Sequence, residues 1–556
     1  MSRKKGNLSK QIVRRAWAMI SCTVLIYSFL IYRLTTIQIL NAQNYKEKVE
    51  KQSVQKVELN SGRGYIYDRN GKLLTDTVKQ EIMIVEQDKF LNDSEVRKAV
   101  EDSSKMEPSE IYRRIENQLK SQVFQIEVEN VKKEDKEKLL ENDIIVEERT
   151  LRYSSDGLLS HTLGYISKSD KIGQSGIEKS KEDILKESNE KYVSAFKAGA
   201  AGNNKDLSIL KGSIKTVNEN DTAEHIKLTI DRDIQKNVEK IVNKEENPTA
   251  VVISDIDTGE ILAMSSRPNF DQNNVAHYFE SEKGELINRT IQSIYPPGSV
   301  FKIVVLYAAL DEGVVDENYT YNCSGKVEVS NKTKQILNCN NREGHGTQTL
   351  QQAFSNSCNT AFFDIAIKTG KEKIIESAKR LHLNEPVEIG LDEEKNREIS
   401  TDIAINNLAI GQGSLGVTPL QINQMTQIIA NNGTYKPLYI YDSIVDSNKN
   451  IIKTFKSSKS EEIISPYTIT IIKEMMKNVS KEGTGKNLKN LKGGCGVKTG
   501  TAQSTLNKKE VEHGWITGFY PEETAKYAIT VLVEGTEDNS KSALPIFKEI
   551  CMKLSK

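Results

Sequence analysis

The sequence has little proline, few cysteines and no net charge, and each deficit excludes a class of protein. Only 11 of the 556 residues are proline, 37% are hydrophobic and 28% are charged. This composition excludes collagen-like and disordered chains. Lys+Arg 77 balance Asp+Glu 77, which argues against a nucleic-acid partner held by a global basic field. Six cysteines are too few for the disulfide scaffold of a small secreted protein. The chain is globular and long enough for about three domains.

Two common catalytic signatures are also missing. There is no G-x-S-x-G elbow, and five histidines lack a partner pattern for a Ser/His/Asp triad, so a triad hydrolase is disfavoured. These five are His161, His225, His277, His382 and His513. The glycine-rich segments at 482–487 and 493–499 do not complete the phosphate-loop pattern, so nucleotide binding is not expected.

The N-terminal segment has the pattern of a membrane anchor. Residues 3–15 hold six basic side chains and no acidic one, and residues 16–32 hold no charge. As a helix this apolar run extends roughly 25 Å, just enough to cross the hydrocarbon core of a bilayer. No small-x-small site follows closely, which argues against a cleaved signal peptide. The positive-inside rule predicts a cytoplasmic basic tail at 1–15, a single transmembrane anchor at 16–33 and an extracytoplasmic remainder.

Periodicity divides the rest of the chain. Charges at helical spacing fill residues 94–150, which predicts solvated helices. Residues 179–225 are polar and weakly patterned, as expected of an irregular connection. Apolar alternation predicts strands within 226–266 and again within 516–535, with long helices between them. The expected fold class is α+β, with one sheet that joins segments distant in the chain.

The first motif that carries chemistry is YPPGSVFK, in which Ser299 and Lys302 follow Pro-Pro-Gly. A proline-glycine break before an apolar run predicts that Ser299 lies at a helix N-terminus, with Lys302 on the same face. The helix dipole and a Lys302 amine kept neutral by burial would both ease loss of the Ser299 proton. Ser299 is therefore the candidate nucleophile, although Ser-x-x-Lys alone is also consistent with an ordinary helix start.

Two further motifs follow in order. Ser357 and Asn359, in the segment SCN, offer a hydroxyl that can relay a proton and a carboxamide that can hold a peptide bond. In VKTGTAQ, Gly500 would let a substrate backbone approach an edge strand, and Lys498 would supply positive charge for a terminal carboxylate. Each motif alone can be a cap or a turn, but the three in this order point to one acylation site.

These motifs resemble those of the class B penicillin-binding proteins, membrane-anchored peptidoglycan transpeptidases of the family that carries S-x-x-K, S-D-N and K-T-G. The resemblance covers most of the chain. It includes RGYIYDRNG at 63–71, HTLGYI at 161–166, GQSGIE at 173–178, LTIDRDIQ at 228–235, GQGSLGVTPLQ at 411–421 and GWITGFYP at 514–521. It implies a penicillin-binding transpeptidase fold, an antiparallel sheet flanked by helices, preceded by an elongated α+β pedestal and a transmembrane helix. The implied domains are a pedestal or dimerisation domain at 41–225 and a transpeptidase domain at 226–556.

The resemblance also implies a mechanism, serine acyl transfer on pentapeptide stems with no cofactor required for the chemistry. Ser299 would attack the carbonyl of the penultimate D-Ala, Lys302 would accept its proton, and Ser357 would pass a proton to the departing D-Ala. The acyl group would then pass to an amine of a neighbouring stem, making a cross-link. β-Lactams, as acylating mimics, should trap Ser299.

Other roles follow from the same resemblance. The backbone N–H groups of Ser299 and Thr501 would form an oxyanion hole. Lys498, Thr499 and Thr501 would hold the terminal carboxylate, and Asn359 would hold the stem peptide. The expected partners are peptidoglycan stem peptides on a lipid-linked precursor glycan and a polytopic glycan polymerase in the membrane.

Two other functions use the same motifs. A D,D-carboxypeptidase or β-lactamase would hand the acyl group to water, but the uncleaved anchor and long pedestal argue against a soluble hydrolase. A penicillin-sensing or scaffold protein of the wall-synthesis complex is the third hypothesis. A sensor should need a signalling domain, and a cytoplasmic tail of 15 residues is too short to be one.

A second cluster of chemically active residues lies between the first two motifs. Cys323, Cys339, His345 and Cys358 have the spacing C-x15-C-x5-H-x12-C, which offers soft ligands for a tetrahedral structural zinc site. Cys358 is the least secure ligand, and Asp311 or a water could replace it. A disulfide from Cys323 to Cys339 and free buried thiols remain alternatives. The same arrangement resembles sporulation-linked members of the family, and a bound zinc would stiffen the loop of the second motif.

Overall fold

The chain divides into two compact units, and each is described by itself. The computed structural model describes residues 3–41, 54–117, 123–186, 190–198, 208–209, 215–218, 224–330, 335–395, 398–456, 459–506, 509–536 and 541–555. The smaller unit comprises Met1–Asn60, Gln80–Arg149 and Glu190–Glu219, and the larger comprises Ser61–Lys79, Thr150–Asn189 and Asn220–Lys556. Two segments of the range 41–225 that was expected to form the pedestal, Ser61–Lys79 and Thr150–Asn189, belong to the larger unit.

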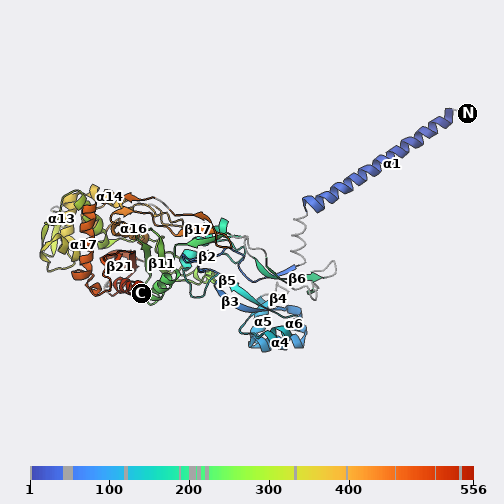
Figure 1. Ribbon diagram of the computed structural model, residues 1–556, viewed down its shortest axis with the longest axis horizontal. Coiled ribbons are helices and arrows are strands. Elements are labelled where there is room, and N and C mark those ends of the chain that lie inside the picture. The colour runs from blue at the N-terminus through green and yellow to red at the C-terminus, as the bar shows by residue number, and fades with distance from the viewer. Residues whose placement is uncertain are drawn as a thin grey trace. The chain divides into compact units, whose positions relative to one another are not determined.

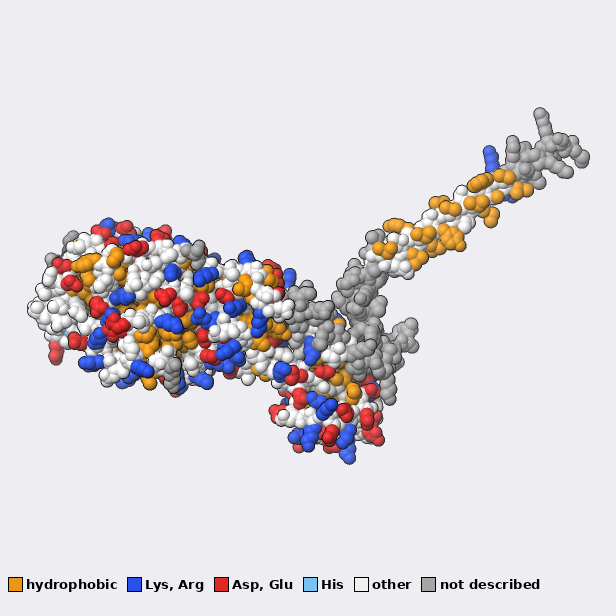
Figure 2. All heavy atoms as spheres, in the orientation of Figure 1, with side chains coloured by type: hydrophobic (Ala, Val, Ile, Leu, Met, Phe, Trp, Pro, Cys, Tyr) orange, Lys and Arg blue, Asp and Glu red, His pale blue; other side chains and the backbone are white. Residues whose placement is uncertain are grey.

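The N-terminal helix α1 (Arg3–Thr35) is long and apolar. Its segment Ile12–Thr35 has a mean hydropathy of 1.6 and is not buried, and Figure 2 shows hydrophobic side chains along it. In length and composition this segment is able to cross a bilayer. A short π-helical turn, η1 (Thr36–Leu40), follows it.

The smaller unit contains a three-stranded sheet of order β4-β3-β5. Its strands are β3 (Val78–Glu86), β4 (Val123–Val128) and β5 (Ile145–Leu151), and Phe90 and Phe124 pack edge-to-face in its apolar core, with ring centroids 5.3 Å apart. The helices expected within 94–150 are present, but β4 and β5 interrupt them and were not expected. The other elements of the unit are α3 (Gln87–Asn92), α4 (Ser94–Ser104), α5 (Pro108–Asn117), α6 (Lys133–Glu141), β1 (Val54–Glu58), β6 (Lys191–Ala198), β7 (Ser208–Ile209) and β8 (Lys215–Asn218).

The larger unit is built on a five-stranded antiparallel sheet of order β11-β10-β22-β21-β20. The strands are β10 (Thr249–Asp255), β11 (Ile261–Arg267), β20 (Gly496–Leu506), β21 (Lys509–Tyr520) and β22 (Tyr527–Val533). Every residue of β10 and β11 is buried, because helices cover both faces of the sheet (Figure 1). The sheet joins distant segments of the chain, as predicted, and leaves β20 as an edge strand.

Helices and small sheets complete the larger unit. Helix α16 contacts β10, β21 and β22, and α18 contacts β21 and β22. The helical elements are α7 (Ser160–Leu163), α8 (Gly176–Ser180), α9 (Glu182–Leu185), α10 (Arg232–Val242), η2 (Val275–Tyr278), η3 (Gly298–Phe301), α11 (Lys302–Asp311), α12 (Leu350–Ser355), α13 (Asn359–Thr369), α14 (Lys371–Arg380), α15 (Ile405–Ala409), α16 (Pro419–Ala430), α17 (Pro466–Glu482), η4 (Lys486–Leu488) and α18 (Ala543–Leu554). The remaining strands are β2 (Ile66–Tyr67), β9 (His225–Leu228), β12 (Thr320–Cys323), β13 (Lys326–Ser330), β14 (Gln335–Asn338), β15 (Gly346–Thr349), β16 (Thr434–Tyr435), β17 (Tyr441–Val445), β18 (Ile451–Thr454) and β19 (Glu461–Glu462).

A buried ion network fastens the two N-terminal segments of the larger unit to each other. Arg152 contacts Asp76 at 2.7 Å and Glu178 at 2.8 Å, and Arg63 contacts Glu178 at 2.9 Å. All four side chains are at most 4% exposed. Burial raises the pKa of Asp76, and the nearby Arg152 opposes that change. Charges this deeply buried are tolerated only when they are paired.

Candidate active site

Ser299 lies in the first turn of a helix, as its motif predicts. The first turn is the 3₁₀ segment η3, which leads directly into α11 at Lys302. Gly298 has φ +54°, and a Cβ there would lie 2.6 Å from the carbonyl oxygen of Thr501. Only glycine fits this left-handed, crowded position without strain. A Cβ on Gly500 would lie 3.0 Å from Val300, so the absent side chain of Gly500 makes room for the Ser299 loop.

The Lys302 side chain is fully buried beneath Ser299's helix turn. Its Nζ donates to the Ser357 carbonyl oxygen at 2.7 Å, to Ser357 Oγ at 3.2 Å and to Asn359 Oδ1 at 2.8 Å. Burial lowers the pKa of Lys302 to about 7, against the opposing effect of the Cys358 and Cys339 thiols. A lysine with this pKa can accept a proton at neutral pH.

Ser357 joins two motifs that are far apart in the chain. It lies between α12 and α13 with φ +53°, a left-handed conformation that is uncommon for non-glycine residues. Its Oγ accepts from Lys302 Nζ and, at 3.1 Å, from Lys498 Nζ. One hydroxyl therefore stands between two amines, with the geometry of a proton relay.

Lys498, the lysine of the third motif, lies on the edge strand β20. It is fully buried, and its Nζ also donates to the Thr499 carbonyl oxygen at 2.9 Å. Burial, and then the charge of Lys302, lower the pKa of Lys498 well below its usual value. Lys498 is therefore buried beneath the residues that line the cleft, and its role toward a substrate carboxylate stays a prediction.

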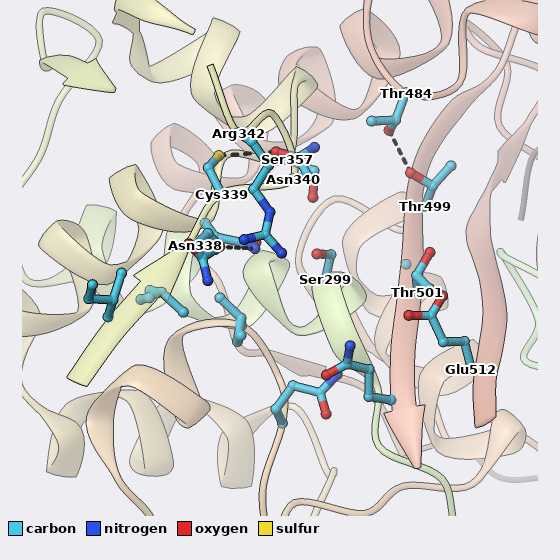
Figure 3. Close-up of a pocket in the computed structure, with 17 residues that line it drawn as sticks. Ser299, Asn338, Cys339, Asn340, Arg342, Ser357, Thr484, Thr499, Thr501 and Glu512 are labelled. Carbon is cyan, nitrogen blue, oxygen red and sulfur yellow. Dashed lines mark hydrogen bonds between the residues drawn. The ribbon is translucent and has the colours of Figure 1, made fainter. Parts of the chain in front are cut away.

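A cleft of about 540 Å³ opens above these residues (Figure 3). Among the described residues, no hydrogen bond joins Ser299 Oγ to Lys302 Nζ, and such contacts often tighten only when substrate binds. The cleft is lined by Ser299, Ser357, Asn359, Thr499, Gly500 and Thr501 of the predicted set, and also by Ile336, Leu337, Asn338, Cys339, Asn340, Arg342, Ile410, Gln412, Thr484, Gln503 and Glu512. Six of the eight predicted catalytic and binding residues therefore line one cleft, and the two lysines support it from below.

Sequence reasoning missed several residues that line the cleft. The Thr484 and Thr499 hydroxyls are hydrogen-bonded to each other. Thr484 belongs to the glycine-rich segment 482–487, whose sequence does not complete a phosphate-loop pattern and indicates no other role. The Gln412 carboxamide, oriented by its partners, donates to the Gln503 carbonyl at 3.2 Å and accepts from the Gln503 amide at 3.0 Å. Gln412 thereby pairs with the open edge of β20 at Gln503, two residues beyond Thr501. The segment GQGSLGVTPLQ was the only sequence signal for Gln412.

Cys323, Cys339, His345 and Cys358 meet at one point, as their spacing predicts. Their ligand atoms all lie within 4.8 Å of one another. Cys339 Sγ is 3.6 Å from both His345 Nδ1 and Cys358 Sγ. The hydrogen bond shared with Cys358 lowers the pKa of Cys339 below its usual value.

The four donors have the residue types and the mutual spacing of a tetrahedral zinc site. All three cysteines are free and buried, and separations of 3.6 Å suit ligands bound to one ion at roughly 2.0–2.3 Å. Asp311 is paired with Arg380 at 3.0 Å and is not among the four residues that converge. Asn359 Nδ2 donates to the carbonyl oxygen of Asn338 at 3.0 Å. Because Asn338 precedes Cys339 in the chain, the cysteine cluster is linked directly to a residue of the second motif.

Comparisons with known proteins agree with this geometry. Residues 249–552 match the family described as penicillin binding protein transpeptidase domain, and residues 58–218 match the penicillin-binding protein dimerisation domain. Stage V sporulation protein D of Bacillus subtilis is 28% identical over 509 residues, covering 87% of this chain and 75% of that protein. Peptidoglycan D,D-transpeptidase MrdA of Acinetobacter baumannii is 23% identical over 595 residues, covering 96% and 86%.

The fold is also found among solved structures. A chain from the structure titled "Structural coordination of polymerization and crosslinking by a peptidoglycan synthase complex" aligns with a TM-score of 0.66 at 21% identity, covering 96% of this chain and 97% of that one. The transpeptidase match spans more than half of the sequence and contains the three motifs that line and support the cleft. The chain therefore belongs to the class B penicillin-binding proteins, in which a dimerisation domain precedes the transpeptidase domain.

Proposed function

We propose that this chain is a membrane-anchored peptidoglycan D,D-transpeptidase that cross-links stem peptides through an acyl-Ser299 intermediate. The observation that carries the proposal is the meeting of Lys302 Nζ and Lys498 Nζ on Ser357 Oγ, at 3.2 and 3.1 Å, under the cleft that Ser299 lines. The family match and the relatives named D,D-transpeptidases support the same chemistry. No cofactor takes part in it.

In the acylation step, Lys302 in its neutral form takes the Ser299 proton while Oγ attacks the carbonyl of the penultimate D-Ala. The backbone N–H groups of Ser299 and Thr501 would stabilise the oxyanion, and one such donor typically lowers the barrier by roughly 2.7–4 kcal/mol. The lowered pKa of Lys302 gives a substantial neutral fraction near pH 7. Attack and proton removal are thus both available without a histidine.

In the departure of D-Ala, Ser357 is the proton donor to the leaving nitrogen. Its hydroxyl can be resupplied from Lys302, which holds the proton taken from Ser299, because the two groups are hydrogen-bonded. Lys498 keeps Ser357 in place through its own bond to Oγ. Asn359 both accepts from Lys302 and faces the cleft, so it would orient the base and the stem peptide together.

The terminal carboxylate of the donor stem would be bound by threonine hydroxyls on and beside the edge strand β20. Thr499 and Thr501 are on the edge strand, and Thr484 is hydrogen-bonded to Thr499. Lys498 contributes from beneath this site by fixing the Thr499 carbonyl. β-Lactams would occupy the same cleft as acylating mimics of the donor.

We propose the following arrangement for the whole chain in the cell membrane. Residues 1–15 form a cytoplasmic tail, 16–33 a single-pass anchor, 41–225 a pedestal or dimerisation domain and 226–556 the extracytoplasmic transpeptidase domain. The apolar helix α1 and the excess of basic residues before it support this orientation. The partner would be a polytopic glycan polymerase, since a structural neighbour belongs to a complex that polymerises and cross-links peptidoglycan. A sporulation role is supported by the likeness to stage V sporulation protein D.

The proposed nucleophile is tested by covalent labelling with a fluorescent penicillin. Wild-type protein and a surface control, Ser109→Ala, should be labelled, and Ser299→Ala should stay unlabelled. Slow loss of the label is expected of a transpeptidase, whereas release within seconds would indicate a β-lactamase-type hydrolase. Equal labelling of wild type and Ser299→Ala would refute the assignment.

A structural Zn²⁺ bound by Cys323, Cys339, His345 and Cys358 is part of the proposal. These residues would hold the metal, and the metal would supply only rigidity to the segment that carries Ser357. Elemental analysis of purified protein should find about one zinc per chain, lost in Cys339→Ser and kept in Cys495→Ser, whose thiol is buried elsewhere. Zinc-free protein with a 323–339 disulfide would remove the site.

A further inference from the structure

Arg342 is a cation in the wall of the cleft that the proposed chemistry does not use. It and Glu512 are the two ionic side chains that line the cleft among the described residues. Arg342 is exposed, and it makes no ion pair with any residue in the described part of the chain. Figure 3 shows its side chain reaching from the loop above Asn338 into the cleft toward Ser299. An unpaired guanidinium so placed is available to an anionic group of a substrate.

The loop that carries Arg342 is held firmly. Asn341 Nδ2 donates to the Gly344 carbonyl at 2.7 Å, and Asn341 Oδ1 accepts from the Glu343 amide at 3.1 Å. A Cβ on Gly325 would lie 2.1 Å from the Arg342 carbonyl oxygen, so β13 begins in close contact with the loop. A cation on a fixed backbone selects geometry as well as charge.

The donor stem leaves Arg342 without a partner. A D-Ala-D-Ala end carries one carboxylate, and the hydroxyls of Thr484, Thr499 and Thr501 on the β20 side provide for it. Arg342 lies on the opposite wall from β20 (Figure 3). The cleft volume of about 540 Å³ is within the range of roughly 300–1,000 Å³ that encloses drug-sized ligands. Ser299 and Arg342 line the same cleft, so a nucleophile that attacks the acyl group at Ser299 comes within the cleft that Arg342 lines.

We propose that Arg342 determines specificity for the acyl acceptor by binding a carboxylate of the acceptor stem. The carboxylate meant is not the one adjacent to the amine that attacks the acyl group. The inference rests on the proposed transpeptidase function. In the transfer step the amine nitrogen forms a bond to the acyl carbon, the bond from that carbon to Ser299 Oγ breaks, and the proton lost by the amine ends on Oγ. When water takes the place of the amine, the same bond breaks and a free acid is released. Arg342 thus favours transfer over hydrolysis by holding the peptide nucleophile in place.

The experiment measures the ratio of transfer to hydrolysis with the full chain in detergent. The donor is a synthetic stem peptide ending in D-Ala-D-Ala, and the acceptor is a stem peptide shortened so that it cannot act as donor. The acceptor is offered with its carboxylates free, with all of them amidated, and with each amidated in turn. The variants are Arg342→Gln, the charge-conserving Arg342→Lys, and Glu343→Gln as a neighbour that does not line the cleft.

Arg342→Gln should lower the ratio about tenfold with the free acceptor, the change expected from one hydrogen bond to a charged group. It should leave the ratio with the fully amidated acceptor, and the rate of penicillin acylation, within twofold of wild type. Arg342→Lys should retain part of the preference, and Glu343→Gln all of it. Among the acceptors amidated at one position, the acceptor that lowers the wild-type ratio as much as Arg342→Gln does identifies the carboxylate that Arg342 binds.

Two results would overturn the inference while leaving the proposed function intact. The first is a wild-type ratio that is equal for free and amidated acceptors. The second is an Arg342→Gln variant that slows penicillin acylation as much as it lowers transfer, which would place Arg342 on the donor side. Failure of penicillin to label Ser299 in wild type would instead refute the proposed function, and the acceptor site with it.

Discussion

Placing a carboxylate beside Lys302 should move the pH dependence of acylation by a predictable amount. In the wild type, burial lowers the pKa of Lys302 from 10.5 to about 7. A lysine at its usual pKa would be neutral in only about one molecule in 3,000 at pH 7, whereas at a pKa of about 7 roughly half are neutral. Because only the neutral amine can take the Ser299 proton, acylation should rise with pH through about 7 and level off above about 8.

The variant Asn359→Asp tests this reasoning quantitatively. Asn359 Oδ1 lies 2.8 Å from Lys302 Nζ, so a carboxylate there would stabilise the ammonium by about 6 kcal/mol at an effective dielectric constant of 20. If desolvation of the new carboxylate offsets half of this, the pKa of Lys302 still rises by about 2 units. The neutral fraction at pH 7 then falls to about 1%, and acylation should fall about 50-fold and recover near pH 9.

The assay is the second-order rate constant for fluorescent penicillin between pH 5.5 and 9.5, with circular dichroism to show that each variant stays folded. Asn359→Ala is the matched control, because it also loses the carboxamide but introduces no charge. Its rate should fall without a rise in the midpoint. A wild-type rate that is flat from pH 6 to 9, or the same midpoint in both variants, would show that Lys302 is not the titrating base.

Two further predictions concern the parts that position the site. Gly298→Ala should lower the free energy of unfolding by about 1–3 kcal/mol and slow acylation at least tenfold, because the new Cβ would lie 2.6 Å from the Thr501 carbonyl oxygen. The control is Gly313→Ala, which has a similar φ but no atom within 4 Å of its new Cβ, and it should leave acylation unchanged. Equal effects of the two substitutions would contradict the crowding at Gly298. Arg152→Leu should lower the free energy of unfolding in urea by about 3–5 kcal/mol, because it leaves Asp76 and Glu178 buried beside fewer cations. Arg113→Leu, whose side chain is 72% exposed, should change it by less than about 1 kcal/mol, and similar losses in both would show that the buried network is not needed.

Local signals in the sequence were sufficient for much of the fold and of the site. The alternation of apolar residues at 249–266 predicts the paired strands β10 and β11, which the structure contains. The Pro-Pro-Gly break predicts a helix start at Ser299, which is present as η3 followed by α11. The spacing of the cysteines and His345 likewise anticipated their convergence. Each of these features depends mainly on neighbours in the chain.

Other features depend on tertiary contacts that no local pattern records. β4 and β5 lie among charged helices; β4 is mostly buried, β5 is mostly half-buried, and neither alternates strictly between buried and exposed residues. The depth of Lys498 follows from the packing of β20 against the Ser357 turn, so a motif alone could not tell a wall residue from a buried one. Arg342 and Thr484 are single loop residues without periodicity, and only the folded chain brings them to the cleft.

The acyl-Ser299 intermediate is tested most directly by mass mapping of the acyl-enzyme formed with a peptide substrate. Full-length protein is mixed with a thioester analogue of a stem peptide, quenched in acid within seconds and digested. The peptide containing Ser299 should carry the acyl mass, and Lys302→Arg, which keeps the charge but cannot act as a base, should form no acyl-enzyme. Acyl mass on any other residue, or acylation of Lys302→Arg at the wild-type rate, would contradict these roles of Ser299 and Lys302.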